Sequence, residues 1–186
     1  MKVYIKNIAT VYSGVYAKPN LSGDAFCLQA SMFDEFGDLL SGTRPNVAID
    51  KSTFRHLLGS GDVLFAAKGS NNFAVEYKPI IGPAIASSTF LVIRPEVNVV
   101  LPSYIVWYLN HPFTQANLKS RAKGSSIPSI SKQILIDMEI PLPSIAKQEQ
   151  ILKIQSLRDR ERRISKKLEK LKDQLIQDKL LLAAKQ

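Results

Sequence analysis

Two histidines, His56 and His111, and a single cysteine, Cys27, are the side chains of this sequence best suited to nucleophilic, acid–base or metal chemistry. Such chemistry needs partners at set spacings, either a base beside a nucleophile or several His, Cys and carboxylate ligands around a metal. Neither histidine has such partners, and Ser60 lacks the spacing of a nucleophile elbow. No phosphate-cradling glycine-rich loop is present. We therefore expect no catalytic residue, no metal and no cofactor, and we expect both histidines to be surface or capping residues.

The run Asn110-His111-Pro112-Phe113 is similar to the Asn-Pro-Pro-aromatic signature of amino-methyltransferases. The second position is His111, and no glycine motif for a cofactor precedes the run. Pro112 is better explained as the first residue of a helix, because its missing N–H is not needed there. A methyltransferase fragment that binds S-adenosylmethionine is therefore the weakest of the functions considered.

The composition predicts one globular domain with an appendage. Apolar residues make up 45% of the 186 residues, which is enough for a real core, and Cys27 between Phe26 and Leu28 is expected to be a small buried hydrophobe. The first residues lack a hydrophobic signal core, and the longest apolar runs are too short to span a bilayer. We therefore expect a cytoplasmic protein that has no membrane contact.

The chain is basic, with a formal net charge of +9 and a pI of about 9.7. Residues 144–186 carry +6 of this charge and residues 1–143 carry +3. An excess of this size suits a polyanion or an acidic protein as partner, although on its own it is weak evidence.

The longest predicted element is a helix from Ile145 to Lys185, a stretch with no Gly and no Pro. Pro141 and Pro143 bring the chain in extended, and Ser144 is well placed as the N-cap. Along the helix, apolar residues recur at alternating steps of three and four, as a two-stranded coiled coil requires. The predicted dimerisation stripe comprises Ile154, Leu157, Ile164, Leu168, Leu171, Leu175 and Leu182, with Glu161 and Asp178 as polar breaks.

A helix of this length would measure about 60 Å, more than a domain of this size needs to cover its own core. We therefore interpret residues 144–186 as a spacer and docking arm that needs one partner helix. The alternative is a terminal helix that folds back on its own domain.

Residues 1–143 are predicted to form an α+β domain, with strands first and helices later. The expected strands lie within 1–16, with a turn at Ser13-Gly14, and at 25–29, 47–50, 63–67, 73–78, 89–94 and 137–140. Loops are expected at 18–24, 41–46, 68–72 and 125–131. The expected helices are 53–58 capped by Ser52, 103–109 preceded by Pro102 at its first position, and 112–123 stopped by Gly124.

Several motifs in this order resemble a target-recognition domain of the specificity subunit of type I restriction-modification enzymes. Gly61-Asp62-Val63-Leu64-Phe65 looks like the Gly-Asp-Ile-Leu strand of that family, and Tyr104 to Asn110 looks like its Tyr-rich helix. The other matching runs are Thr89 to Pro95, Gly124 to Lys132, Ile140 to Pro143, and Gln148-Glu149-Gln150-Ile151.

The resemblance implies a non-catalytic subunit that reads double-stranded DNA for an adenine methyltransferase subunit and a restriction subunit. Members of the family usually carry two such domains and two long helices, whereas this chain has one of each. It therefore implies a half-subunit that dimerises through its helix, which would set the spacer between half-sites. A homodimer with two-fold symmetry would read an inverted repeat.

Sequence readout needs side chains that reach base edges, with Lys and Arg on the phosphates. Asn71 or Asn72 would suit a bidentate contact with adenine, and Arg44 or Arg121 one with guanine. The predicted DNA-binding residues are Arg44, Asn46, Lys68, Ser70, Asn71, Asn72, Lys119, Arg121, Lys123, Ser125 and Ser126. For each residue, a solvated loop without function remains the alternative.

A second hypothesis is a protein-interaction adaptor, in which the coiled coil joins other proteins and the basic charge serves only solubility. DNA binding that falls steeply with salt distinguishes the two hypotheses.

Overall fold

The structure is a computed structural model that describes every residue except 19, 21–22, 70, 123–127 and 186. The chain forms two compact units, Met1–Glu149 and Gln150–Gln186. The long helix α5 (Ile145–Ala183) begins in the first unit and forms the second, and the first unit combines sheets with short helices. The predicted α+β class is confirmed. Among the described residues, no helix combines the length and the apolar content that crossing a bilayer would take.

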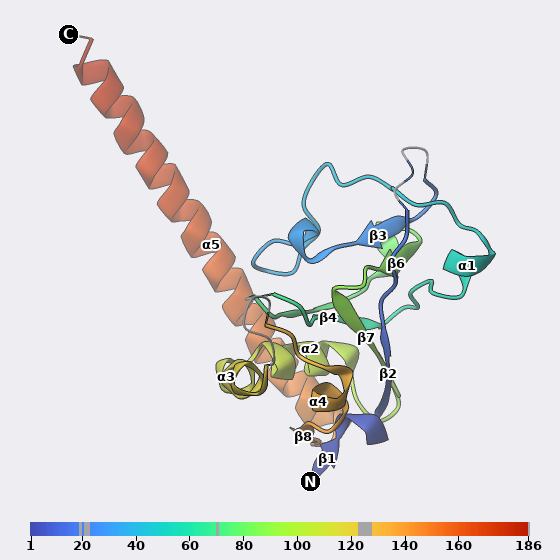
Figure 1. The fold of residues 1–186 in the computed structure, drawn as a ribbon. Coiled ribbons are helices and arrows are strands. Elements are labelled where there is room, and N and C mark those ends of the chain that lie inside the picture. The colour runs from blue at the N-terminus through green and yellow to red at the C-terminus, as the bar shows by residue number, and fades with distance from the viewer. Residues whose placement is uncertain (19, 21–22, 70, 123–127, 186) are drawn as a thin grey trace. The chain divides into compact units, whose positions relative to one another are not determined.

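The first unit is centred on a four-stranded antiparallel sheet (Figure 1). The strands occur in the order β2 (Ala9–Ser13), β7 (Phe90–Pro95), β4 (Val63–Ala66) and β5 (Ala74–Glu76). The register places Val11 opposite Ile93 and Leu64 opposite Val92. All four residues of β4 are buried, as expected for a strand that is covered on both faces. The predicted strands at 63–67, 73–78 and 89–94 therefore all lie in this sheet.

A parallel pair of short strands, β3 (Phe26–Leu28) and β6 (Ala84–Ala86), packs against the sheet. Leu28 from β3 shares a core cluster with Leu64 and Phe90. The rings of Phe33, Phe73 and Phe90 meet edge to face, with centroids 6.2–6.3 Å apart. Cys27 is buried in a neighbouring cluster, as predicted, and its burial raises the pKa of the thiol.

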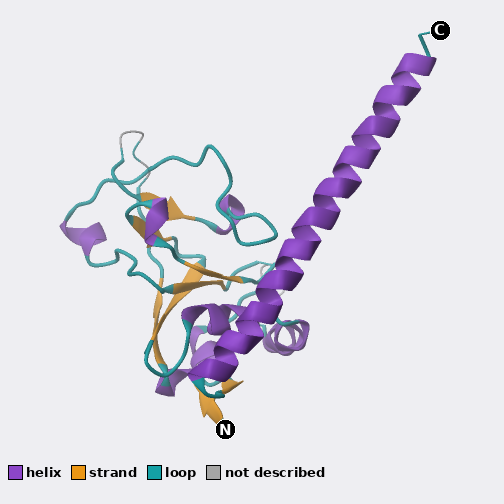
Figure 2. Ribbon diagram, turned by 180° about the vertical axis from the view of Figure 1, so that it is seen from behind, coloured by secondary structure: helices purple, strands orange, loops and turns teal. Residues whose placement is uncertain are grey.

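The segment between β3 and β4 is mostly loop, as Figure 2 shows, with a 3-10 turn at Ala30–Met32 and the short helix α1 (Lys51–Phe54). The predicted strand at 47–50 is wrong, because only Val47 pairs, in a single bridge with Ala25. The predicted helix at 53–58 is also wrong: α1 begins two residues earlier and stops at Phe54. Its cap is Asp50, whose carboxylate accepts a 2.8 Å hydrogen bond from the Thr53 backbone N–H.

The later helices follow the prolines, as predicted. Pro102 and Pro112 stand in the first turns of α2 (Pro102–Asn110) and α3 (Pro112–Arg121), and α2 packs against β5 and β4. The predicted cap Gly124 lies outside the described residues. His111 is a capping histidine, since its Nδ1 accepts a 3.2 Å hydrogen bond from the backbone N–H of Phe113.

A short helix that the sequence analysis missed, α4 (Lys132–Ile136), precedes the last strand. Ser131 caps it by accepting a hydrogen bond from the N–H of Ile134. The predicted strand at 137–140 is shifted and becomes β8 (Glu139–Pro141), which pairs with β1 (Lys2–Tyr4) beside the N-terminus (Figure 1). A 3-10 turn at Ile5–Asn7 separates β1 from β2, and another at Pro79–Ile81 precedes β6.

The first turn of α5 is held by Gln148, a fully buried polar side chain. Its Oε1 accepts a 2.9 Å hydrogen bond from the backbone N–H of Leu101, just before α2. Its Nε2 donates to the carbonyl oxygens of Pro143 at 2.9 Å and Val99 at 3.3 Å. Gln148 therefore uses its amide oxygen and its amide nitrogen to join the start of α5 to the start of α2.

Candidate functional site

The predicted DNA-binding loop after β4 lies beside residues 128–130. The backbone N–H of Ile130 donates to Ala67 O at 2.8 Å, and the N–H of Gly69 donates to Pro128 O at 2.9 Å. Between them, Lys68 and Ser129 form an antiparallel bridge. The loop that carries Lys68 is thus fixed against the segment that follows α3.

The exposed polar side chains among the predicted residues of these regions come from two places. Lys68 and Asn71 are exposed in the loop after β4, and Lys119 and Arg121 are exposed in the last turn of α3. The opposite side of α3 is buried through Thr114 and Leu118. Three cations and an amide that can donate and accept hydrogen bonds are suited to contact phosphates and base edges. The predicted residues Ser70, Lys123, Ser125 and Ser126 lie outside the described residues.

Two of the predicted asparagines have hydrogen bonds within the protein. Asn72 is buried, and its Nδ2 donates a 2.9 Å hydrogen bond to Ala66 O. The side-chain oxygen of Asn46 accepts a 2.7 Å hydrogen bond from the backbone N–H of Cys27. A bidentate contact with adenine uses the side-chain amide oxygen and the amide nitrogen together. Of the two asparagines predicted to bind adenine in the first loop, Asn71 is therefore the remaining candidate. Arg44, in the loop before Asn46, is exposed.

Asn110, part of the sequence run that is similar to the methyltransferase signature, also has a structural role. Its Oδ1 accepts from the N–H of Ala74 at 2.7 Å, and its Nδ2 donates to the carbonyl of the same residue at 2.8 Å. The amide therefore binds β5 at the edge of the sheet in the way that a neighbouring strand would.

A buried carboxylate, Asp62, binds three segments of the first unit together. Its Oδ1 accepts from Arg94 Nε at 2.7 Å, and its Oδ2 accepts from Arg94 Nη2 at 2.6 Å and from the backbone N–H of Gly59 at 2.8 Å. The Tyr12 hydroxyl donates to Oδ2 at 3.2 Å. Asp62 and Arg94 come from two of the runs that carried the family resemblance, and they meet as a bidentate ion pair.

The surroundings of this cluster change the proton affinities of its members. Burial, followed by the charge of Asp62, raises the pKa of Tyr12 to about 12. The hydrogen bonds to Asp62 raise the pKa of Arg94 above its usual value. Both side chains therefore keep their protons at neutral pH, and the cluster is a structural support of β2, β4 and β7. In the part of the chain that the structure describes, no three His, Cys, Asp or Glu side chains converge as a metal site would require.

The comparison with protein families identifies the class. The family described as "Type I restriction modification DNA specificity domain" matches residues 46–172, which is more than half of the chain. This chain belongs to that family.

Individual relatives agree with this assignment. The specificity subunit of the type I restriction enzyme MjaVIII from Methanocaldococcus jannaschii is 31% identical over 101 residues, which make up 54% of this chain and 22% of that subunit. The chain thus spans less than a quarter of this relative.

Solved structures show the same fold. The HsdS subunit from Thermoanaerobacter tengcongensis aligns with a TM-score of 0.63 and 20% identity, covering 89% of this chain and 44% of that one. The S subunit of a type I restriction-modification system from M. genitalium aligns with a TM-score of 0.57 and 14% identity, covering 86% of this chain and 39% of its own. This chain spans less than half of either structure.

Proposed function

We propose that this chain is a DNA sequence-specificity subunit of a type I restriction-modification system and that it binds one half of a bipartite target. The observation that carries the proposal is the family match over residues 46–172, which includes the loop at Lys68, α3 and much of α5. The exposed Lys68, Asn71, Lys119 and Arg121 supply groups that such binding needs.

In this proposal the two parts of the chain have different roles. Residues 1–143 bind DNA, with Asn71 as a base-reading residue and Lys68, Lys119 and Arg121 on phosphates. Residues 144–186 pair with a second helix, set the spacing of the half-sites and dock an adenine methyltransferase subunit and, in complexes that cut DNA, a restriction subunit. The second helix is that of a second copy, as in the homodimer expected from the sequence, or that of another specificity chain. The chain itself supplies no catalytic group to the reaction.

Selection from a pool of random double-stranded DNA tests this function. The purified chain, with and without a co-purified adenine methyltransferase, is expected to enrich one short sequence, with binding that falls steeply as salt rises. Binding without enrichment, or no binding at low salt in either preparation, would favour the adaptor hypothesis.

Replacing Arg121 with alanine is expected to weaken binding to all DNA sequences about equally, because a phosphate contact carries no sequence information. The plot of log K against log salt should lose about one unit of slope. The measurement is a fluorescence-anisotropy titration at several salt concentrations. The matched control is Arg55→Ala, which removes an exposed arginine that is not among the predicted DNA-binding residues. An unchanged slope for the Arg121 variant would rule out a phosphate contact there.

A further inference from the structure

The apolar stripe of α5 is exposed along the second unit. We call Ile154, Leu157, Ile164, Leu168, Leu171, Leu175 and Leu182 the α5 seam, and each of its members is between 51% and 69% exposed. A narrow stripe of this kind is the a/d face of a two-stranded coiled coil, and it buries its side chains only when a second helix lies along it.

Six of the nine positions that flank the seam are basic. In a coiled coil these e and g positions face the partner helix and determine which partner binds. No flanking position between residues 153 and 181 carries an acid. In chain order they are Lys153, Arg158, Arg160, Ser165, Lys167, Lys172, Gln174, Lys179 and Leu181.

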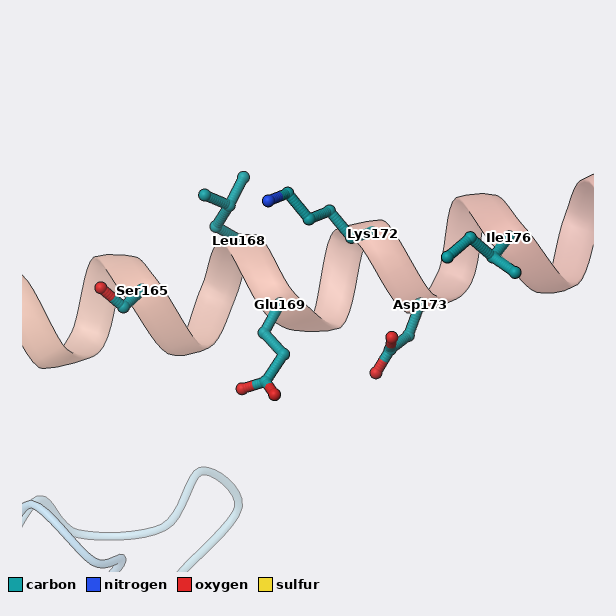
Figure 3. Close-up of a pocket in the computed structure, with 6 residues that line it drawn as sticks. All are labelled: Ser165, Leu168, Glu169, Lys172, Asp173 and Ile176. Carbon is teal, nitrogen blue, oxygen red and sulfur yellow. The ribbon is translucent and has the colours of Figure 1, made fainter.

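The acids of the same stretch lie at other positions: Glu161 and Asp178 interrupt the seam itself, and the others lie away from it. Figure 3 shows Leu168 and Lys172 projecting from one side of α5, with Glu169 and Asp173 on the opposite side. Asp159, also away from the seam, lies 3.9 Å from the guanidinium of Arg162 on the outer face. Among the ion pairs between described residues, none involves the six basic side chains that flank the seam. In the described part of the helix, these six side chains therefore form no ion pair.

A second copy of this helix would repel the first in either orientation. In a parallel pair, Lys167 of one helix would face Lys172 of the other, and Glu161 would face its own counterpart inside the seam. In an antiparallel pair, flanking positions of the same kind meet. Each of them is basic or uncharged, so no facing pair there is attractive and several, such as Arg158 with Lys179, are repulsive. Like charges at such positions are destabilising, and opposite charges are stabilising by similar amounts.

We propose that the α5 seam binds a non-identical helix, one whose own Leu/Ile seam is flanked by Glu and Asp. Charge complementarity is the reason for this choice, because acidic flanks on the partner helix can pair with all six basic positions of α5. The inference rests on the helix-pairing part of the proposed function. Its test contains no DNA, so that its failure leaves the DNA-binding part unaffected.

The test uses the full chain and two synthetic helices with the same Leu/Ile seam over about four heptads. One peptide has Glu at every e and g position and the other has Lys. Isothermal titration calorimetry is expected to show binding of the Glu peptide that weakens as salt rises, and at least tenfold weaker binding of the Lys peptide. Equal affinity for the two peptides would overturn the proposal.

A charge-reversal pair identifies the side chains responsible. The double substitution Lys167→Glu and Lys172→Glu is expected to weaken binding of the Glu peptide by about tenfold, since two attractive pairs become repulsive. The matched control Lys166→Glu and Lys170→Glu makes the same charge change away from the seam and is expected to bind within about twofold of the original chain. Equal losses for the two variants would contradict the assignment of the flanks.

The self-association of the chain alone provides a third measurement. Sedimentation of the chain alone is expected to show a monomer at low salt and stronger association at high salt, where the flanking charges are screened. A stable dimer at low salt would mean that a second copy is the partner and would overturn the proposal.

Discussion

Replacing Arg94 with methionine is expected to lower the free energy of unfolding by about 2–4 kcal/mol. The methionine keeps the length and apolar character of the side-chain stem but leaves the carboxylate of Asp62, which is 1% exposed, without its cation. Breaking a buried pair in this way usually costs more, but the Arg94 side chain is 49% exposed and water already screens part of its charge. Urea denaturation followed by fluorescence of Trp107 measures the loss.

Two further variants isolate the cause. Arg55→Met removes an exposed arginine and is expected to change the stability by less than about 0.5 kcal/mol. The double variant Arg94→Met and Asp62→Asn removes the buried charge and keeps an oxygen for the N–H of Gly59. It should recover part of the stability lost in the single variant, because no unpaired carboxylate remains. If the single and double variants were equally unstable, the buried charge would not be the reason.

Replacing Gln148 with leucine is expected to lower the free energy of unfolding of the first unit by about 2–4 kcal/mol. Leucine has nearly the same size, but it leaves the N–H of Leu101 and the carbonyls of Pro143 and Val99 without the partner that Gln148 provides. Each such buried group costs about 1–3 kcal/mol when it is left unsatisfied. Because the contact joins α5 to α2, hydrogen exchange in the first turns of α5 should also become faster.

The control for this variant is a substitution of the neighbouring exposed residue, Glu149. Glu149→Gln changes a side chain in the same helical turn and is expected to leave both the stability and the exchange rates nearly unchanged. Unchanged exchange in the Gln148 variant would mean that the first turns of α5 are held in place by other contacts.

The elements that the sequence predicted best have strong local signals. Pro102 and Pro112 mark the first turns of α2 and α3, and a stretch free of Gly and Pro is α5. The strand prediction at 47–50 is wrong because strand formation depends on pairing with another segment of the chain. Val47 looked like the start of a strand, but it forms an isolated bridge with Ala25 rather than part of a ladder. The helix α4 was missed because its five residues are too few to show helical periodicity.

The candidate site was only partly predictable for a related reason. Residue types identified Lys68, Asn71, Lys119 and Arg121 as exposed polar groups near turns or helix ends. That Lys68 pairs with Ser129 depends on a bridge across sixty residues of sequence, which no local pattern encodes. The same limit explains Asn72, whose polarity suggested solvent but whose side chain is buried against the backbone at Ala66. Gln148 and Asp62 stood in the runs that resembled the family, yet only the structure gives their roles.

The pairing of β1 with β8 brings the first residue of the chain next to the residues that precede α5. The carbonyl of Met1 accepts a 2.9 Å hydrogen bond from the N–H of Leu142, so the start of the unit and the residues just before α5 stand one strand spacing apart, about 5 Å. A unit whose ends meet can be cut out, inserted into another chain or circularly permuted with a short connecting loop. An insertion or permutation that keeps Met1–Glu149, and with it the contacts of Gln148, therefore keeps both this strand pair and the start of α5.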